Sequence, residues 1–522
     1  MAERTVVAEA PATQPHDPHD PHDPHEPRLT RRGLIGSAAA LAGLWSMATQ
    51  ESAHAAPPAV AADVDPGALL PKLVRRITLG LTPAELTLAQ NLGYDGYLEY
   101  HLDHAAIPED ANLTTRLSAL TTLNMIPLDL FPLQAGQVIG EISEAQLLRA
   151  ILSKRQLFER MVEFWTDHFN IDITKGDDRY LKTYDDRTVI RPFALDTFPN
   201  LLNASAHSTA MLYYLDNTGS IAGNANENYA RELLELHTLG ADGGYTQTDV
   251  EQVARCLTGW TMWGRGQGTN TGTFRYDATR HDTGQKIVLG HVIPARSAAA
   301  GIQDGIDVLN ILIDHPSTAR YLATKMCKWF LSENPPTSVI NAVAGVYTAT
   351  RGDIKAMLRE VLKANVVAEA PLKYKRPFHM FVSGLRAVNA LVATTSAVRT
   401  QLTGAGHQQF YWPTPDGYPD KVDFWGGFIL PRWNFAASMM NSAGSQTAGG
   451  INGVTVDHAA FFAGATTADA MADRINTTIF AGELPTGERN RLRDYLLPNA
   501  PTTLRQREAL GLALSTPSFQ WY

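Results

Sequence analysis

Apolar residues recur at helical spacing through most of the chain that follows Leu70. Between Leu147 and Trp165 they fall at positions i, i+3 and i+4 of successive turns, with Arg155 as an interruption. This spacing places the apolar side chains on one face, which is the pattern of an amphipathic helix. The sequence therefore predicts one long helix that runs past Leu147 and reaches His168.

Three further helices follow from the same pattern. One covers about residues 226–239, and another covers residues 316–330. The remaining helix is expected to begin at Thr248, because Thr248 and Glu251 have the spacing of a capping box, and to end before Gly259. We expect a mainly α fold, with one large multi-helix domain, a small β-hairpin insertion and long irregular loops.

Two stretches interrupt the helical pattern. Residues 264–272 form a glycine-rich loop, and residues 274–276 and 287–289 are expected to pair around it as the β-hairpin. The second irregular stretch covers residues 404–432. Because no linker-like composition follows Pro66, residues 70–522 are predicted to form a single helical domain.

The N-terminal segment has the pattern of an export signal. Residues 30–36, Thr-Arg-Arg-Gly-Leu-Ile-Gly, resemble the twin-arginine motif. The apolar run from Leu34 to Met47 is shorter than the roughly 20 residues of a membrane span, and residues 53–55, Ala-His-Ala, offer a cleavage site. We expect residues 1–55 to be a twin-arginine signal peptide that is removed on export. The mature protein would then be periplasmic, at the cell surface or secreted, without a membrane span; an uncleaved anchor is the alternative.

Two biased segments flank this signal. Upstream, a His-Asp-Pro leader places His16, His19, His22 and His25 at every third position, a composition that binds transition metals weakly. We expect the leader to be lost with the signal peptide. Downstream, residues 56–69 are rich in Ala and Pro and are interpreted as a linker.

Charge and cysteine content exclude several classes of function. The formal net charge is −9 and the pI is about 6.0, which makes binding to nucleic acid a poor expectation. The two cysteines, Cys256 and Cys327, form no Cys-x-x-Cys motif, so zinc-finger and thioredoxin chemistry are not indicated. They either pair as a disulfide or lie buried as small apolar residues, and the second interpretation is favoured.

The segment Asn226–His237 carries the densest set of reactive side chains. On a regular helix His237 lies on the apolar stripe, while Glu232, Glu235 and Arg231 lie on the other side. One interpretation is a pocket in which carboxylates tune His237 as a general base. The other is a buried structural histidine beside a solvated charged face, and this helix alone favours it. The spacing matches neither a zinc-protease nor a di-iron motif.

Other acid–imidazole pairs can join this set. Asp167 and His168 end one predicted helix, and His281 and Asp282 follow the glycine-rich loop. If these groups converge on His237, they form an acid–base pocket or a site for a divalent metal ion. Each pair taken alone is more typical of a structural role. A Gly-x-Ser-x-Gly nucleophile motif is absent from the sequence.

Aromatic residues concentrate in the second irregular stretch. Trp412, Tyr418 and Trp425 lie there among prolines and glycines, with further aromatic neighbours up to Phe435. Flat aromatic faces on loops suit sugar rings, so these three residues and Arg231 are candidate ligand-binding groups. The alternative, which we favour slightly, is that the aromatic side chains fill a core between helices.

Together these segments resemble a bacterial family known as domain of unknown function eighteen hundred. The resemblance covers about residues 70–522 and is carried by Trp165-x-x-His168-Phe169, Tyr214-Leu215-Asp216-Asn217, residues 226–240, Gly244-Tyr245-Thr246, Asp249-Val250, Thr258-Gly259-Trp260, His281-Asp282, residues 315–320 and Lys373-x-Lys375-x-Pro377. It implies an exported, largely helical protein whose gene often neighbours that of an exported sulfatase-like protein. The family usually has His-Asn where this chain has Thr166-Asp167, so a ligand at that histidine would be altered here.

Two hypotheses for the function follow. The first is an exported hydrolase of a polysaccharide or similar polymer. Its catalytic residues would be His237, Glu232, Glu235 and Asp167, with His168, His281 and Asp282 as ligands of a divalent metal cofactor. The second is a non-catalytic exported binding or assembly protein that acts with the sulfatase-like partner. Convergence of the histidines would favour the first, and scattered histidines with an exposed aromatic groove would favour the second.

Overall fold

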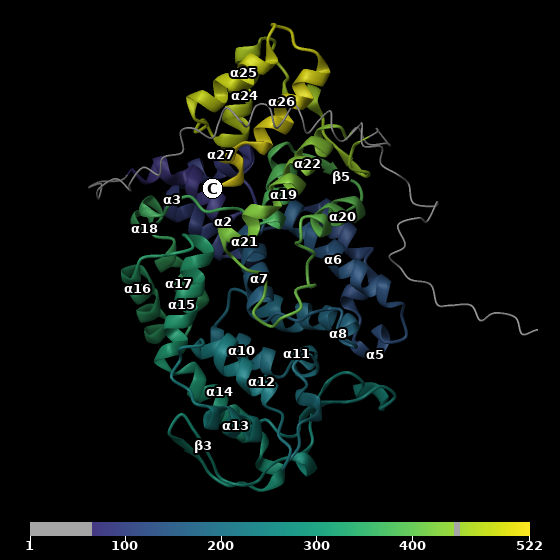
Figure 1. Cartoon of the computed structure of the whole chain (residues 1–522), viewed down its shortest axis with the longest axis vertical. Coiled ribbons are helices and arrows are strands. Elements are labelled where there is room, and N and C mark those ends of the chain that lie inside the picture. Colours follow the sequence, from purple (N-terminus) through teal and green to yellow (C-terminus); the bar gives the residue numbers. More distant parts are fainter. Residues whose placement is uncertain (1–64, 443–448) are drawn as a thin grey trace, which may run out of the picture. The chain divides into compact units, whose positions relative to one another are not determined.

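The computed structural model describes residues 65–442 and 449–522, so the signal peptide, its leader and linker residues 56–64 lie outside the described residues. Helices dominate the described chain (Figure 1), which confirms the mainly α fold. The helices in the first half are α2 (Leu70–Ile77), α3 (Pro83–Leu102), α4 (Ala111–Ser118), α5 (Pro127–Leu130), α6 (Ala135–Leu152), α7 (Gln156–His168), α8 (Asp178–Asp185), α9 (Arg191–Phe193), α10 (Phe198–Ala206), α11 (Thr209–Tyr214), α12 (Glu227–Glu232) and α13 (Gln247–Cys256).

The second half continues in the same way. Its helices are α14 (Ile302–Ile313), α15 (Pro316–Phe330), α16 (Thr337–Thr350), α17 (Ile354–Val361), α18 (Ala364–Glu369), α19 (Pro377–Ala387), α20 (Ser396–Gly404), α21 (Val422–Trp425), α22 (Ile429–Met440), α23 (His458–Phe461), α24 (Ala468–Phe480), α25 (Thr486–Leu496), α26 (Thr503–Ser515) and α27 (Pro517–Gln520). Helix α15 has the predicted bounds. No helix in the described ranges is both long and apolar enough to cross a membrane.

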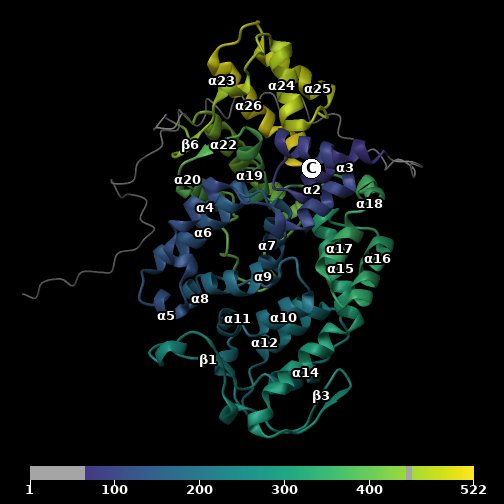
Figure 2. The ribbon, with the colours of Figure 1, turned by 180° about the vertical axis from the view of Figure 1, so that it is seen from behind.

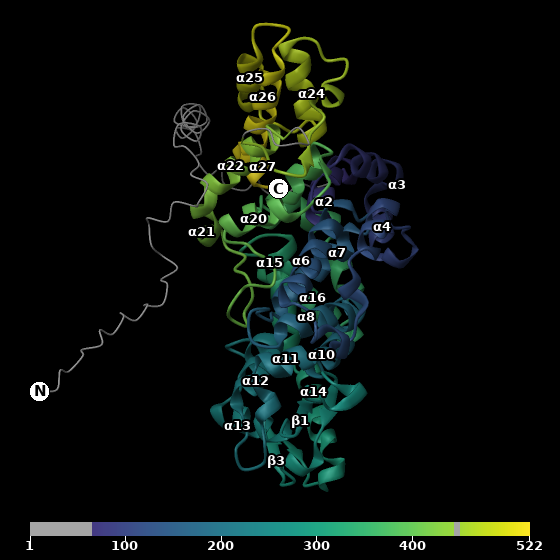
Figure 3. The ribbon, with the colours of Figure 1, turned by 90° about the vertical axis from the view of Figure 1, so that its right-hand side faces the viewer.

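Side chains of these helices form two large apolar cores. The first draws on residues between Leu70 and Ala370 and includes the packing of α15, α16 and α17 (Figure 2). Helix α13 packs against both α12 and α14, and all three helices contribute side chains to this core (Figure 3). The second core is formed mainly by residues between Phe378 and Phe519, where α22, α24, α25 and α26 pack together (Figure 1).

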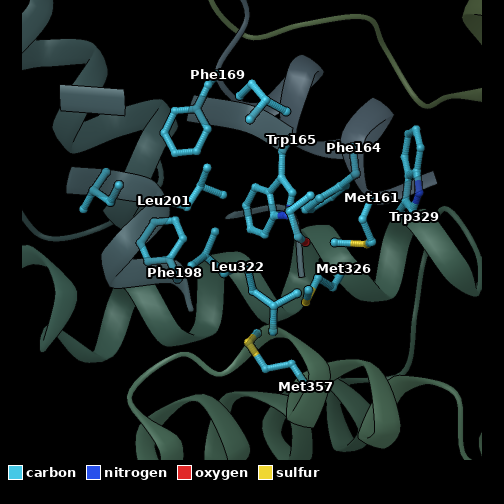
Figure 4. Close-up of a cluster of buried hydrophobic side chains, with 14 of the residues drawn as sticks. Met161, Phe164, Trp165, Phe169, Phe198, Leu201, Leu322, Met326, Trp329 and Met357 are labelled. Atoms are coloured by element: carbon cyan, nitrogen blue, oxygen red, sulfur yellow. The ribbon is translucent and has the colours of Figure 1, made fainter. Parts of the chain in front are cut away.

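Helix α7 lies at the centre of the first core. The Trp165 side chain is 1% exposed and donates a hydrogen bond from Nε1 to the carbonyl of Ala194 at 3.0 Å. Side chains from α10, α15 and α17 surround it, among them Phe198, Leu322 and Met357 (Figure 4). This packing fixes the C-terminal end of α7, where Asp167 and His168 lie.

The long helix predicted from Leu147 to His168 is wrong in one respect, because α6 and α7 are separate helices. The chain leaves the helical conformation at residues 153–155. There the Ser153 hydroxyl donates to Glu109 and accepts the N–H of Arg155. The side-chain amide of Gln156 donates from Nε2 to the Ser153 carbonyl at 2.7 Å. These side-chain contacts replace the hydrogen bonds of a continuous helix.

The predicted capping box is displaced by two residues. Helix α13 begins at Gln247, and Thr246 rather than Thr248 is its N-cap. The Thr246 hydroxyl accepts the N–H of Asp249, while the Asp249 carboxylate accepts the N–H of Thr246 at 2.8 Å. Thr246 and Asp249 have the same Thr-x-x-acid spacing as Thr248 and Glu251, so spacing alone does not show which threonine is the N-cap.

The predicted β-hairpin is also paired differently. Strand β2 (Phe274–Tyr276) pairs with β1 (Trp260–Met262), and β3 (Lys286–Val288) pairs with β4 (His291–Ile293). Leu289 and Gly290 connect the second pair with positive φ angles of 49° and 79°, as a tight two-residue hairpin turn requires. A further two-residue pair joins β5 (Leu391–Val392) to β6 (Val454–Thr455).

Both cysteines are buried and neither is paired, as expected for small apolar residues of a core. Burial raises the pKa of each thiol to about 12. Cys256 and Cys327 therefore remain protonated thiols at neutral pH.

Candidate functional site

His237 lies on a π-helical segment, Leu233–Leu239, that continues α12. Its side chain is fully buried, and neither ring nitrogen has a hydrogen-bond partner among residues 65–442 and 449–522. Burial and the nearby Lys325 lower its pKa to about 3, so the ring is neutral. The structure places the neutral His237 imidazole beneath the surface, away from solvent.

His168 packs directly against this segment. Its Nε2 atom lies 3.1 Å from the carbonyl oxygen of His237, and the two ring centroids are 6.2 Å apart. Burial, Lys325 and His237 lower the pKa of His168 well below its usual value. The two histidines therefore form a neutral, buried layer that joins the end of α7 to the π-helical segment.

Asp167 is the neighbouring residue, and its side chain reaches the surface. Its Oδ2 atom accepts a hydrogen bond from Nη1 of Arg376 at 2.5 Å, while its side chain remains 18% exposed. Oδ1 of Asp167 has no hydrogen-bond partner within the described part of the chain. Burial raises the pKa of Asp167 to about 6, against the opposing attraction of Arg376.

Arg376 is held in place from three sides. Its second guanidinium nitrogen donates to Glu163 at 2.5 Å, and the guanidinium carbon lies 4.6 Å from the ring centroid of Trp329. A planar guanidinium satisfies two carboxylates and one aromatic face at the same time. Arg376 therefore fixes the Asp167 carboxylate in one position.

Lys325 on α15 contributes the opposite charge. Its Nζ atom lies 5.6 Å from the ring centroid of Tyr321, but it makes no hydrogen bond or ion pair with the described residues. Burial lowers its pKa to about 8, and the charges of Asp167 and Asp416 raise it in part. The ammonium group is thus within electrostatic reach of both carboxylates while its hydrogen-bond donors are free.

A loop between residues 410 and 420 brings Asp416 to this place. Asn170 donates from Nδ2 to the carbonyls of Trp412 and Thr414 at 2.9 and 2.8 Å. Gly417 lies so close to Asp167 that an added Cβ would come within 2.2 Å of the Asp167 carbonyl oxygen. Trp412 then donates from Nε1 to Oδ1 of Asp416 at 3.0 Å, which places an indole beside this carboxylate.

Glu232 lies at the end of α12, and Glu235 lies in the π-helical segment that continues this helix. Burial raises the pKa of Glu232, with contributions from the charges of Glu235 and Asp416. Glu235 accepts a hydrogen bond from the hydroxyl of Tyr245 at 2.7 Å. Arg231 has a side chain that is 41% exposed and pairs with Glu227 at 3.1 Å, so it lies on the outer, solvated face.

His281 and Asp282 have other partners. Nδ1 of His281 lies 2.8 Å from the carbonyl of Thr258, and its Nε2 lies 3.2 Å from Asp304. Asp282 accepts two hydrogen bonds from Arg255, at 2.8 and 3.0 Å. Within the described residues no three His, Cys, Asp or Glu side chains form a group that could hold a metal ion. The structure does not bring His168, His281 and Asp282 together.

Of the three aromatic candidates for ligand binding, Trp425 and Tyr418 mainly pack against other residues of the protein. Trp425 is 1% exposed and donates to the carbonyl of Pro419 at 2.5 Å. Tyr418 donates to the carbonyl of Gln408 at 2.5 Å, and its ring packs on His407 with centroids 4.4 Å apart. Trp412 is half-buried and remains available beside Asp416.

Sequence reasoning missed Lys325, Arg376 and Asp416. A usable signal existed for Lys325, because it stands one helical turn from Leu322 and beside Met326, both on the apolar face of α15. A lysine at such a position is a buried charge that needs an explanation. Arg376 lies inside the Lys373-x-Lys375-x-Pro377 motif, but no local spacing links it to Asp167.

Searches of curated proteins and of solved structures find no match to this chain. A protein-family model does match, and it covers residues 72–521. That range contains all the residues of the cluster formed by Asp167, Lys325, Arg376 and Asp416. The chain belongs to the family described as "Protein of unknown function (DUF1800)".

Proposed function

We propose that this chain is an exported hydrolase of a polysaccharide or similar extracytoplasmic polymer, with Asp167 as general base and Lys325 as general acid. One observation carries this proposal. The ammonium of Lys325 has no hydrogen-bond or ion-pair partner in the described residues, and it lies in the field of a carboxylate whose Oδ1 is free. An unpaired, partly buried ammonium beside a carboxylate is costly to keep for stability alone.

The pKa values suit this division of roles. Between pH 6 and 8 Asp167 is ionised and Lys325 is protonated. Oδ1 of Asp167 takes a proton from a water molecule, and the water oxygen forms a bond to the electrophilic carbon of the substrate. The bond from this carbon to the leaving oxygen breaks, and that oxygen takes a proton from Lys325. Arg376 orients the base, and the buried His168 and His237 position the end of α7.

The substrate class rests on the surroundings of this pair. Trp412 presents an indole whose N–H is bound to Asp416, and Tyr245 lies beside Glu235. Aromatic faces next to carboxylates suit the apolar faces and the hydroxyl groups of sugars. The twin-arginine-type signal supports a site of action outside the cytoplasm, where such polymers occur.

The test compares the wild-type protein with Asp167→Asn and Lys325→Met on a panel of defined polysaccharides. Each variant is expected to lose about 10²- to 10⁴-fold in kcat, the usual contribution of a general acid or base. Lys328→Met is the matched control, because Lys328 is exposed on the same helix, and it should keep full activity. Turnover that both Asp167→Asn and Lys325→Met retain would refute the proposal. Binding without any turnover in the wild type would instead support a non-catalytic protein that acts with a sulfatase-like partner.

A further inference from the structure

A small cavity of about 20 Å³ lies where α2, α24 and α27 meet (Figure 1). Apolar side chains form much of its wall, among them Ile479, Phe480 and Phe519. A volume of about 10–15 Å³ is enough for one occupant of the size of a water molecule. The cavity therefore has room for one small molecule or one ion.

Lys375 brings an amino group to this cavity. Its side chain is 5% exposed, and Nζ lies 3.9 Å from the ring centroid of Phe519. Within residues 65–442 and 449–522 this nitrogen forms no hydrogen bond and no ion pair. It keeps accessible surface, unlike Nη2 of Arg432, which also lacks a partner but is closed off completely. Nζ of Lys375 is therefore open to an occupant of the cavity.

The charged groups that act on Lys375 are cations. Burial and the charges of Arg75 and Arg432 lower the pKa of Lys375 well below its ordinary value. Arg75 lines the cavity and pairs with the exposed Glu483. Arg432 is fully buried, and its Nη1 donates to Oε1 of Gln520 at 3.1 Å, but no carboxylate of the described chain pairs with it. Positive charge is thus in excess around the cavity.

This excess favours a bound anion. A buried ammonium without a partner is strongly unfavourable, and an adjacent negative charge offsets the loss of its hydration. The described residues supply Lys375 with no carboxylate, so the negative charge has to come from the occupant of the cavity. A phosphate, a sulfate or an organic acid has several heavy atoms and exceeds the volume of one water-sized occupant. A monatomic anion fits.

We infer that Lys375 binds a chloride ion in this cavity, with the charge of Arg75 beside it. The ammonium donates an N–H to the ion, and Phe480 and Phe519 shield the pair from solvent. The ion stabilises the junction of α2, α24 and α27, which bring the cationic and the apolar parts of the wall together. This anion site is independent of the proposed hydrolase reaction.

The test is urea unfolding of the intact protein in sodium chloride, sodium bromide and sodium gluconate. The ionic strength is matched in the three series, so that general screening is equal. Gluconate is too large for the cavity. An ion that binds only the folded state stabilises it in proportion to the logarithm of its concentration above the dissociation constant. Chloride and bromide should raise the urea midpoint over gluconate, and a tenfold excess over the dissociation constant should lower the unfolding equilibrium constant about tenfold.

Lys375→Met removes the amino group and places an apolar chain in the same space. In gluconate this variant should be at least as stable as the wild type, because it no longer buries a cation without a partner. In chloride it should gain no stability over gluconate. Lys363→Met is the control, because Lys363 is 53% exposed and pairs with Glu360 at 2.6 Å, and it should keep the full dependence on chloride.

A second measurement uses the wild type alone. Crystals grown in bromide should show an anomalous scattering peak in contact with Nζ of Lys375, and this peak decides the question if Lys375→Met fails to fold. Equal urea midpoints in chloride and gluconate, a chloride dependence that Lys375→Met retains, or the absence of bromide at Nζ would overturn the inference. The occupant would then be a water molecule beside a neutral Lys375.

Discussion

Nη1 of Arg376 lies 2.5 Å from Oδ2 of Asp167, and this contact joins the end of α7 to the residue that precedes α19. The two helices belong to different apolar cores, so the ion pair stands where these cores meet. It also carries the proposed base of the reaction. Stability and function consequently depend on the same pair of side chains.

Replacing Arg376 by alanine should destabilise the protein strongly. The change leaves Asp167 without its cation and Glu163 with only its longer pairing to Arg160 at 3.6 Å, in a buried position where breaking an ion pair costs about 3–5 kcal/mol. Arg359→Ala is the control, because Arg359 is 46% exposed and pairs with an equally exposed Glu99. Urea unfolding should show at most about 1 kcal/mol for this control. Equal effects of the two substitutions would contradict the role given to Arg376.

The activity is predicted to have a bell-shaped pH dependence. Asp167 must lose its proton, with a pKa of about 6, and Lys325 must keep its own, with a pKa of about 8. The profile of kcat/KM should therefore fall below pH 6 and above pH 8. In Lys325→Met the alkaline limb should disappear from the residual activity, since no ionisable group then replaces the ammonium. An alkaline limb that persists in the variant would assign it to another group.

His237 should make the protein sensitive to acid. Its pKa is about 3 in the folded state and about 6.5 when unfolded, so its contribution to stability is present above pH 6.5 and is lost as pH falls toward 3. Between pH 8 and pH 5 this single group removes about 2 kcal/mol of unfolding free energy. His237→Leu should flatten the dependence in that range, whereas the exposed His291→Leu should not. The check is urea unfolding at pH 8, 6.5 and 5.

Gly417→Ala should displace the loop that carries Asp416. The added Cβ would meet the Asp167 carbonyl oxygen at 2.2 Å, and φ is +76° at this position. Gly266 has a similar φ of +78° with open space around it, so Gly266→Ala measures the backbone strain alone. Thermal unfolding should show a markedly larger loss of stability for Gly417→Ala, accompanied by loss of activity. Equal losses would mean that the loop does not depend on contact with Asp167.

Local patterns predicted the helices and failed at their junctions. Helix α15 follows from apolar spacing after Pro316, because both signals are local. The break between α6 and α7 depends on Glu109, which is distant in sequence and bonds Ser153. The pairing of strand β2 was mispredicted for a similar reason. Its partner is β1, which precedes it in the chain, and not the segment 287–289 that follows it.

The candidate site divides in the same way. Asp167, His168, Glu232 and His237 were chosen from two helices that the fold does bring close together. His281 has the same acid–imidazole pattern, but Asp304 and Thr258 hold it in another network. Lys325 and Asp416 were not predicted, because their role depends on proximity between segments that are distant in the sequence. The spacing of residues along one helix carries no information on such proximity.

The proposed mechanism depends most directly on the ionisation of Lys325. Competitive labelling of amino groups, followed by mass spectrometry of the Lys325 peptide from pH 6 to 11, measures this ionisation without a known substrate. Half-maximal reactivity of Lys325 is expected near pH 8, because burial lowers its pKa from the ordinary value of 10.5. Half-maximal reactivity of Lys325 near pH 10.5 would contradict its assignment as the general acid.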